Sequence, residues 1–264
     1  MVMHDQNNNV ILHIDRVSRH FGGLKAVDSV QLNIHKKEIV GLIGPNGAGK
    51  TTLFNLITGH YKPTEGSLYF QNEIISGLKP YKITGKGIAR TFQNIRLFGM
   101  MSVLDNVLLG MHVRLHGGLI SAILCLPGEK TEEAEAKEKA RALLDFVGMG
   151  SKEKEKARNL SYGEQRLLEI ARALAAEPEL LLLDEPAAGM NPQETGSLMK
   201  LISRIRDEMD KTILLIEHDM KVVMGISEKV AVLDYGKKIA EGRPHEIQRN
   251  EAVIRAYLGD SDSI

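Results

Sequence analysis

The chain has 264 residues, of which 43% are hydrophobic, and this composition suits one large globular domain or two closely joined lobes. Lys and Arg total 34 and Asp and Glu total 34, so the net charge is zero, which argues against a dedicated nucleic-acid binder. The single cysteine, Cys125, excludes an internal disulfide and fits a reducing compartment, and no Cys/His cluster has zinc spacing.

Two segments bear on membrane insertion and secretion. Residues 1–9 are polar and contain no apolar run, so we do not expect a signal peptide. The longest apolar stretch, 119–127, is far shorter than the ~20 residues that span a bilayer, and we expect a buried helix there. A role at a membrane would therefore act from its surface or through a partner.

The first part of the chain is expected to form short strands around one helix. Residues 50–58 have helical spacing and end at Gly59, a residue type that commonly follows helices. Alternating or short apolar runs predict strands at 10–17, 27–34, 38–43 and 67–70, of which the first two have the period of half-buried antiparallel strands.

Residues from about 97 to 160 differ in character from what precedes them. Ala, Glu, Lys and Leu recur there with helical spacing, and Glu133 and Lys137 form a favourable i,i+4 pair. The charged run 152–156 is expected to be a solvated loop or face, with a docking site as the alternative. We therefore expect a mostly helical lobe inserted into an α/β frame.

The α/β pattern returns after this helical part. The short apolar runs at 180–183 and 212–216 are typical of buried parallel strands, and a helix is expected between them at 192–209. Residues 230–234 and 237–240 predict a hairpin that turns at Tyr235 and Gly236.

A glycine-rich segment after the strand at 38–43 fits the phosphate-binding pattern G-x-x-x-x-G-K-[ST]. Glycines let backbone N–H groups curl around phosphate oxygens, and the following helix adds the positive end of its dipole. A chance turn is the alternative, and the position between a strand and a helix disfavours it. We therefore expect nucleotide phosphates to be held by Gly44, Pro45, Asn46, Gly47, Ala48, Gly49, Lys50, Thr51 and Thr52.

Two carboxylates follow the buried strand at 180–183. At the carboxyl end of such a strand, side chains open into the crevice where α/β folds bind ligands. Asp184 is suited to holding Mg²⁺, and Glu185 to orienting and deprotonating the attacking water. The alternative is a pair of acids that merely begins a loop before Pro186.

The segment Leu160-Ser161-Tyr162-Gly163-Glu164-Gln165 resembles the LSGGQ signature of ABC ATPases, with Tyr162 and Glu164 as departures. Together with the phosphate-binding loop and the acid pair, the resemblance covers essentially the whole chain. It implies a P-loop NTPase core of ABC ATPase type, with an antiparallel β lobe and an inserted helical lobe. Residues 1–264 would form one such domain, in which 1–96 and 161–264 build the nucleotide-binding core and about 97–160 the helical lobe.

Further positions match the family's motifs. Phe21 is similar to the aromatic residue that stacks on adenine, although a lone Phe is more often part of a core. Gln93, in Arg90-Thr91-Phe92-Gln93, resembles the Q-loop glutamine, and His218 resembles the switch histidine that contacts the γ-phosphate. The resemblance thus implies ATP and Mg²⁺ as cofactors, with Glu185, His218 and Gln93 as catalytic residues and Thr51, Gln93 and Asp184 at the metal.

The family mechanism implies that two ATPase subunits face each other head to tail. ATP would lie between the P-loop of one subunit and Ser161 and Gly163 of the other. Closure on ATP and release after hydrolysis would be passed to membrane subunits through the helical lobe and the loop after Gln93. Asn191 stands where the family's D-loop has an aspartate, so communication between the two sites is expected to differ.

Several local stretches resemble the ATP-binding subunits of bacterial branched-chain amino acid importers. They are 21–27, 90–93, 186–192 and 254–259. The resemblance implies a second, different ATPase subunit, two permeases and, indirectly, a periplasmic binding protein, with this chain on the cytoplasmic face of the bacterial inner membrane. Urea import and lipopolysaccharide export are alternatives within the class, and a soluble ABC ATPase without a transport role is the alternative outside it.

Overall fold

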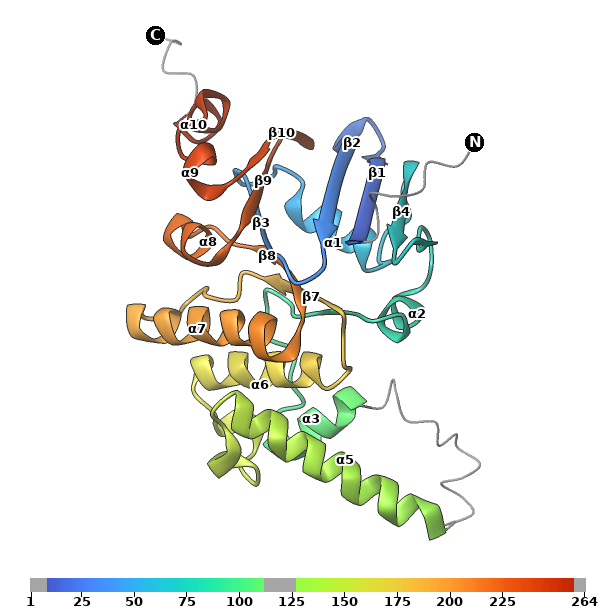
Figure 1. The fold of residues 1–264 in the computed structure, drawn as a ribbon, viewed down its shortest axis with the longest axis vertical. Helices are drawn as coiled ribbons and strands as arrows, with labels where there is room; N and C mark the ends of the chain where they lie inside the picture. The colour runs from blue at the N-terminus through green and yellow to red at the C-terminus, as the bar shows by residue number, and fades with distance from the viewer. Residues whose placement is uncertain (1–8, 112–126, 259–264) are drawn as a thin grey trace.

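The computed structural model describes residues 9–111 and 127–258, and its elements are stacked along one long axis (Figure 1). The expectations for the polar N-terminal segment through residue 8, for the apolar stretch through residue 126 with its Cys125, and for Gly259 lie outside these residues.

A six-stranded sheet forms the centre of the molecule, in the order β10-β9-β3-β8-β7-β6. Five of its strands are parallel and β10 alone runs antiparallel, paired with β9. The expected buried parallel strands and the C-terminal hairpin are present. The bounds are β3 Ile39–Ile43, β6 Ile88–Arg90, β7 Leu180–Asp184, β8 Thr212–Ile216, β9 Lys229–Asp234 and β10 Lys237–Gly242.

A second, antiparallel sheet in the order β2-β1-β4-β5 packs beside the first. Its core face meets α1, whose apolar side chains fill the space between the two sheets. The expected strands are present but longer than the sequence indicated, because pairing continues beyond the alternating residues. The bounds are β1 Val10–Phe21, β2 Leu24–His35, β4 Glu65–Phe70, β5 Glu73–Ile74 and α1 Lys50–Ile57.

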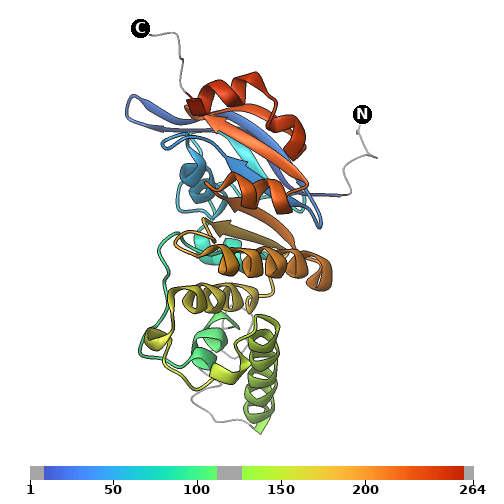
Figure 2. The same cartoon turned by 90° about the vertical axis from the view of Figure 1, so that its left-hand side faces the viewer.

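Helices lie in layers on the other side of the central sheet (Figure 2). Helix α7 separates the sheet from α6, and α3 and α5 lie beyond α6. Because α6 packs on α3 and α5, we propose that it belongs with the helical part even though it follows residue 160. The bounds are α3 Val103–Met111, α5 Pro127–Phe146, α6 Tyr162–Leu174 and α7 Pro192–Met209, with 3₁₀ turns η1 Gly150–Lys152 and η2 Ala157–Asn159.

The remaining helices are short and lie around the two sheets. They are α2 Pro80–Gly85, α8 Met220–Ile226, α9 Pro244–Ile247 and α10 Glu251–Leu258. Within the described ranges, every helix is too short or too polar to cross a bilayer.

Strand β7 shows how the fold fixes the site. Leu181 and Leu183 point into the core shared with the helical layers, whereas Leu180 and Leu182 point into the core shared with α1. All four are fully buried, so the strand cannot shift by one residue without exchanging its two apolar faces. The position of Asp184 at its end is set by this packing.

Candidate functional site

A cavity of about 710 Å³ opens at the carboxyl end of the central sheet, beside the start of α1. Its lining comes from strands β1 and β2, from the start of α1, and from the loops that follow β3, β6, β7, β8 and β9. Leu24, Lys25, Ala26 and Tyr235 line it but were not expected from the sequence. The expected residues that line it are Phe21, Asn46, Gly47, Ala48, Gly49, Lys50, Thr51, Thr52, Gln93, Glu185 and His218.

The glycine-rich loop could not take its path with other residues at two positions. Gly44 has φ +149°, and a Cβ there would lie 2.0 Å from the carbonyl oxygen of Leu233. Gly49 has φ +100°, and a Cβ there would lie 2.4 Å from the carbonyl oxygen of Ala26. The loop therefore turns tightly into α1 and directs the N–H groups at the start of this helix toward the cavity.

Lys50 is the first residue of α1 and is only 6% exposed. Its Nζ donates hydrogen bonds to the carbonyl oxygens of Gly44 at 2.7 Å and Pro45 at 2.9 Å. Burial lowers the pKa of Lys50, and the charges of Glu185 and Asp184 oppose this effect. The loop thus holds a cation next to the carboxylates that end β7.

Glu185 lies between two other expected catalytic side chains. Gln93 Nε2 donates to Glu185 Oε2 at 3.0 Å, and His218 Nε2 lies 2.6 Å from Glu185 Oε1. The three residues follow β7, β6 and β8, which are adjacent parallel strands whose carboxyl ends meet at one edge of the sheet. A carboxylate held in this way can orient a water molecule and accept its proton.

Asp184 is buried just behind Glu185. Its Oδ2 accepts a hydrogen bond of 2.7 Å from Nη2 of Arg90, and the two side chains are 4% and 6% exposed. The sequence placed Arg90 in a family motif but indicated no role for it. A buried ion pair of this kind leaves no signal in a single sequence, because its partners are 94 positions apart.

The expected Mg²⁺ ligands are compatible with that ion. Within the described ranges no three acidic, histidine or cysteine side chains gather into a metal cluster. Mg²⁺ in nucleotide sites is bound by one or two protein oxygens together with phosphates and water, so a larger cluster is not required. Thr51 lines the cavity beside Lys50. Asp184 lies close enough to Lys50 for its negative charge to raise the pKa of that lysine.

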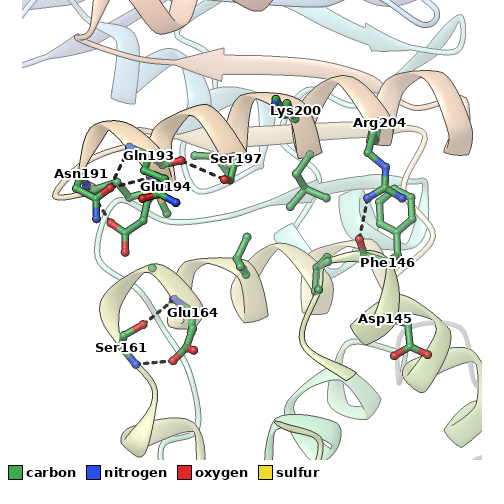
Figure 3. Close-up of a pocket in the computed structure, with 17 residues that line it drawn as sticks. Asp145, Phe146, Ser161, Glu164, Asn191, Gln193, Glu194, Ser197, Lys200 and Arg204 are labelled. Atoms are coloured by element: carbon green, nitrogen blue, oxygen red, sulfur yellow. Dashed lines mark hydrogen bonds between the residues drawn. The ribbon is translucent and has the colours of Figure 1, made fainter. Parts of the chain in front are cut away.

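Ser161 and Gly163 line a different cavity, of about 720 Å³, between α6 and α7 (Figure 3). Ser161 and Asn191 lie at the same end of it, where both helices begin. Within one chain, therefore, the signature residues do not reach the phosphate-binding loop. This is the arrangement that a head-to-tail pair of subunits requires.

Two of the three departures from the family motifs, Glu164 and Asn191, take part in helix caps. At α6, the backbone N–H of Ser161 donates to Glu164 Oε2 at 2.9 Å, and Glu164 N–H donates to Ser161 Oγ at 3.4 Å. At α7, Asn191 Oδ1 accepts from the N–H groups of Gln193 and Glu194, each at 3.0 Å. An asparagine caps a helix about as well as an aspartate, so the neutral D-loop residue keeps this local function.

Phe21 ends β1 at the rim of the first cavity and is 39% exposed, so it is not a core residue. Its ring contacts Tyr61 edge-on, with centroids 5.1 Å apart, and the guanidinium of Arg19 lies 4.6 Å from its centroid. Tyr235, in the hairpin turn, is 87% exposed at the same cavity. Two exposed aromatic rings beside a phosphate loop can stack on a nucleobase.

A buried ion pair joins α6 to the loop that carries Gln93. Arg166 donates from Nη1 to the carbonyl oxygen of Phe92 at 2.7 Å and from Nη2 to that of Gln93 at 3.0 Å. Its partner Glu169 lies 2.8 Å away, and burial raises the pKa of this carboxyl group. This pair was not predicted from the sequence, although charges three residues apart on the apolar side of a helix are a recognisable signal.

Comparisons with known proteins agree with this geometry. Residues 27–188 match the family described as ABC transporter, and residues 237–263 match that described as branched-chain amino acid ATP-binding cassette transporter. The chain is 47% identical over 251 residues to the high-affinity branched-chain amino acid transport ATP-binding protein LivG of Escherichia coli K12, covering 95% of this chain and 98% of LivG. It is 45% identical over 251 residues to the high-affinity branched-chain amino acid transport ATP-binding protein BraF of Pseudomonas aeruginosa, covering 95% of this chain and 98% of BraF.

The fold also has similar counterparts among solved structures. The ADP conformation of an ATP-binding cassette of an ABC transporter superposes with a TM-score of 0.83 at 32% identity, covering 95% of this chain and 99% of that one. The predicted family, the fold class and the ATPase activity are thereby confirmed. The chain belongs to the ABC transporter family and is one of its ATP-hydrolysing, nucleotide-binding subunits.

Proposed function

We propose that the first cavity binds ATP with Mg²⁺ and hydrolyses it, with the residues in the roles that the sequence indicated. The observation that carries this proposal is Glu185, held between Gln93 and His218 at the cavity that the phosphate loop lines. The loop N–H groups and Lys50 bind the phosphates, and Phe21 stacks on the base. Thr51, Gln93 and Asp184 hold Mg²⁺, which neutralises phosphate charge when bound.

The proposed chemistry uses Glu185 as the base. Glu185 Oε1 or Oε2 exchanges a contact with Gln93 or His218 for one with water. It takes the proton as the water oxygen bonds to the γ-phosphorus, while the bond from that phosphorus to the bridging β–γ oxygen breaks and ADP leaves with the bridging oxygen. His218, released from that contact, donates a hydrogen bond to the γ-phosphate. Such positioned acid–base groups contribute about 10²–10⁴-fold to a rate.

We further propose that the site is completed by a second ATPase subunit. Ser161, Gly163 and the start of α6 line a cavity separate from the phosphate loop, so each chain supplies half of two sites. The partner's signature residues would add hydrogen bonds and a helix N-terminus to the γ-phosphate. A different ATPase subunit is the proposed partner, because Asn191 departs from the D-loop of the common pattern.

Permease subunits are proposed to dock beside the loop that carries Gln93, on the side away from the first cavity. A groove of about 380 Å³ lies there between the central sheet and the helical layers. Its lining includes Ile83, Phe92, Phe98, Leu109 and Arg172, and Phe98 is 50% exposed. A permease segment in this groove would place the chain at the cytoplasmic face of the bacterial inner membrane.

Branched-chain amino acids are the proposed cargo, and their uptake the proposed task. The similarity to LivG and BraF over nearly the full chain supports this choice, as does the match of residues 237–263. The cargo does not touch the ATPase in this scheme, so no residue of the cavity distinguishes it from urea or from lipopolysaccharide. A periplasmic binding protein would act on the chain only through the permeases.

Uptake of radiolabelled leucine tests the proposal in cells that lack the chain. Leucine uptake should return with the wild-type chain and stay absent with the Glu185→Gln variant. Radiolabelled urea, measured in the same cells, is the matched comparison. Restored urea uptake without leucine uptake would contradict the amino-acid assignment, and restoration of neither would favour export or a role outside transport.

A further inference from the structure

Arg90 is the last residue of β6, the edge strand of the central sheet, and its guanidinium group is buried on several sides. Its Nη2 donates to Asp184 Oδ2 at 2.7 Å, and its Nη1 donates to Asn55 Oδ1 at 2.7 Å. The guanidinium carbon lies 5.4 Å from the ring centroid of Phe54 and 5.2 Å from that of Phe92. These contacts hold the group between two acceptors and two aromatic rings.

Arg90 therefore connects the two elements from which the phosphate and metal ligands extend. Asn55 belongs to α1, the helix that begins at Lys50 and also carries Thr51, whereas Asp184 ends β7. A planar guanidinium with two donating arms can bridge such elements, which the single point charge of lysine cannot do. Arg90 thus links the helix that carries Thr51 to the strand that ends at Asp184.

The bridge also determines which oxygen of Asp184 remains for other contacts. Oδ2 is occupied by Arg90, and the hydrogen bonds found in the described parts of the chain leave Oδ1 unused. A buried carboxylate needs a cationic or hydrogen-bonding partner, and this one has a partner on one oxygen only. Metal-binding carboxylates are commonly held in this way by an outer hydrogen bond.

We propose that Arg90 is a positioning residue for the metal: it fixes Asp184 through Oδ2 and presents Oδ1 to the Mg²⁺ that accompanies ATP. The inference rests on the proposed ATP and Mg²⁺ site. Arg90 itself touches neither nucleotide nor metal. Its loss should weaken the hold on the divalent ion and leave the contacts of Lys50 with the phosphates in place.

Binding of Mn²⁺ to the full chain tests this role without measuring turnover. The chain and a non-hydrolysable ATP analogue are mixed at equal concentrations, Mn²⁺ is titrated, and free Mn²⁺ is read from its electron paramagnetic resonance signal. The wild-type complex should hold Mn²⁺ more tightly than the free analogue does. Arg90→Met should raise the half-saturating Mn²⁺ concentration by about 10- to 100-fold, toward that of the free analogue.

Three further variants make the result specific. Asp184→Asn is the positive control, because it removes a charge from the proposed ligand itself. Arg96→Met is the matched control: Arg96 lies 4.5 Å from the same Phe92 ring, but its side chain has no bond to Asp184 among the described contacts. Arg90→Lys replaces Arg90→Met if the latter does not fold, because it keeps the charge and loses the second arm.

The outcomes distinguish a failure of the positioning role of Arg90 from a failure of the proposed Mg²⁺ site. If wild type and Asp184→Asn both hold Mn²⁺ no better than the free analogue, the assignment of Asp184 to the metal is wrong and the inference falls with it. If Asp184→Asn weakens Mn²⁺ binding but folded Arg90→Met and Arg90→Lys do not, or if Arg96→Met weakens it equally, the positioning role alone is overturned.

Discussion

The two cavities of this chain are similar in size, about 710 and 720 Å³, and each opens where helices begin. The first contains a buried cation, Lys50, and a carboxylate, Glu185, held by an amide and an imidazole. In the second, Ser161 and Asn191 are occupied in capping α6 and α7. Helices begin at both cavities, but only in the first is a carboxylate held between an amide and an imidazole beside a buried lysine. We therefore call the first cavity the catalytic half-site and the second the complementary half-site.

The largest effect is expected at the base of the first cavity. Glu185→Gln keeps the shape of the side chain but removes the group that accepts the proton from water. ATP hydrolysis should fall by about 10²–10⁴-fold, while ATP affinity is kept. Steady-state phosphate release measures the rate, and a rate close to wild type would remove Glu185 from the catalytic role.

A smaller loss is expected from the cation of the same cavity. Lys50→Ala removes the full positive charge that the phosphate loop holds, and charge-assisted hydrogen bonds of this kind change affinity by about 10- to 100-fold. Titration with a fluorescent ATP analogue should show that weakening. Lys200 lines the second cavity, so Lys200→Ala is the matched substitution there and should leave the affinity unchanged. Equal losses at both positions would contradict the distinction between the cavities.

Glu217 follows β8 directly before His218, and its contribution to the stability of the folded chain should depend on pH. Its carboxylate accepts hydrogen bonds from the N–H of Ala187 at 2.7 Å and of His218 at 3.2 Å, and burial raises its pKa. Between the ordinary and the raised pKa, the folded chain holds a proton that the unfolded chain has released. The stability due to this group is therefore complete below the ordinary pKa and is lost as pH rises through the folded pKa.

Substitution of this residue should remove that dependence. In Glu217→Gln, the free energy of unfolding should fall less steeply as pH rises through this window, by at most about 1.4 kcal/mol per pH unit relative to wild type. Urea unfolding of both chains across the same pH series measures the difference. Parallel curves for the two chains would show that Glu217 has the same pKa in the folded and the unfolded chain.

The smallest effect is expected at the cap of α7 in the second cavity. Asn191→Ala removes the acceptor of two backbone N–H groups and should lower the free energy of unfolding by about 1 kcal/mol. Asn191→Asp restores an acceptor of the same shape and should be near wild type. Urea unfolding of the three chains decides this, and a destabilised Asn191→Asp would show that the neutral amide has a role beyond capping.

The residues of the catalytic half-site were largely predictable from the sequence. The contacts that hold their side chains in place were not. The phosphate loop, Asp184 and Glu185 occur as contiguous motifs, and the apolar run before Asp184 identifies the strand that presents them. Arg90, by contrast, acts through Asn55 and Asp184, which are brought to it by the pairing of β6 with β7 and by α1. Such contacts depend on packing between distant segments.

In the complementary half-site, the sequence likewise did not predict the roles of individual side chains. The sequence showed that Tyr162, Glu164 and Asn191 depart from the family motifs, but not what they do instead. The structure shows Glu164 and Asn191 as caps, and Tyr162 beside Gly189, where an added Cβ would lie 3.2 Å from its ring. Strand lengths were underestimated for a related reason, because backbone pairing in β1 and β2 continues through residues without apolar alternation.

If each chain contains two halves of different sites, ATP hydrolysis should depend on a second subunit, and a comparison of ATPase rates decides this. The rate per chain is measured for this chain alone and for its complex with the partner ATPase subunit and the permeases, each with and without Ser161→Arg. We expect a low rate for the chain alone and a raised rate in the complex. Ser161→Arg should abolish that increase, while ATP still binds to the chain's own phosphate loop. Full activity of the isolated chain at low concentration, unaffected by Ser161→Arg, would contradict this expectation.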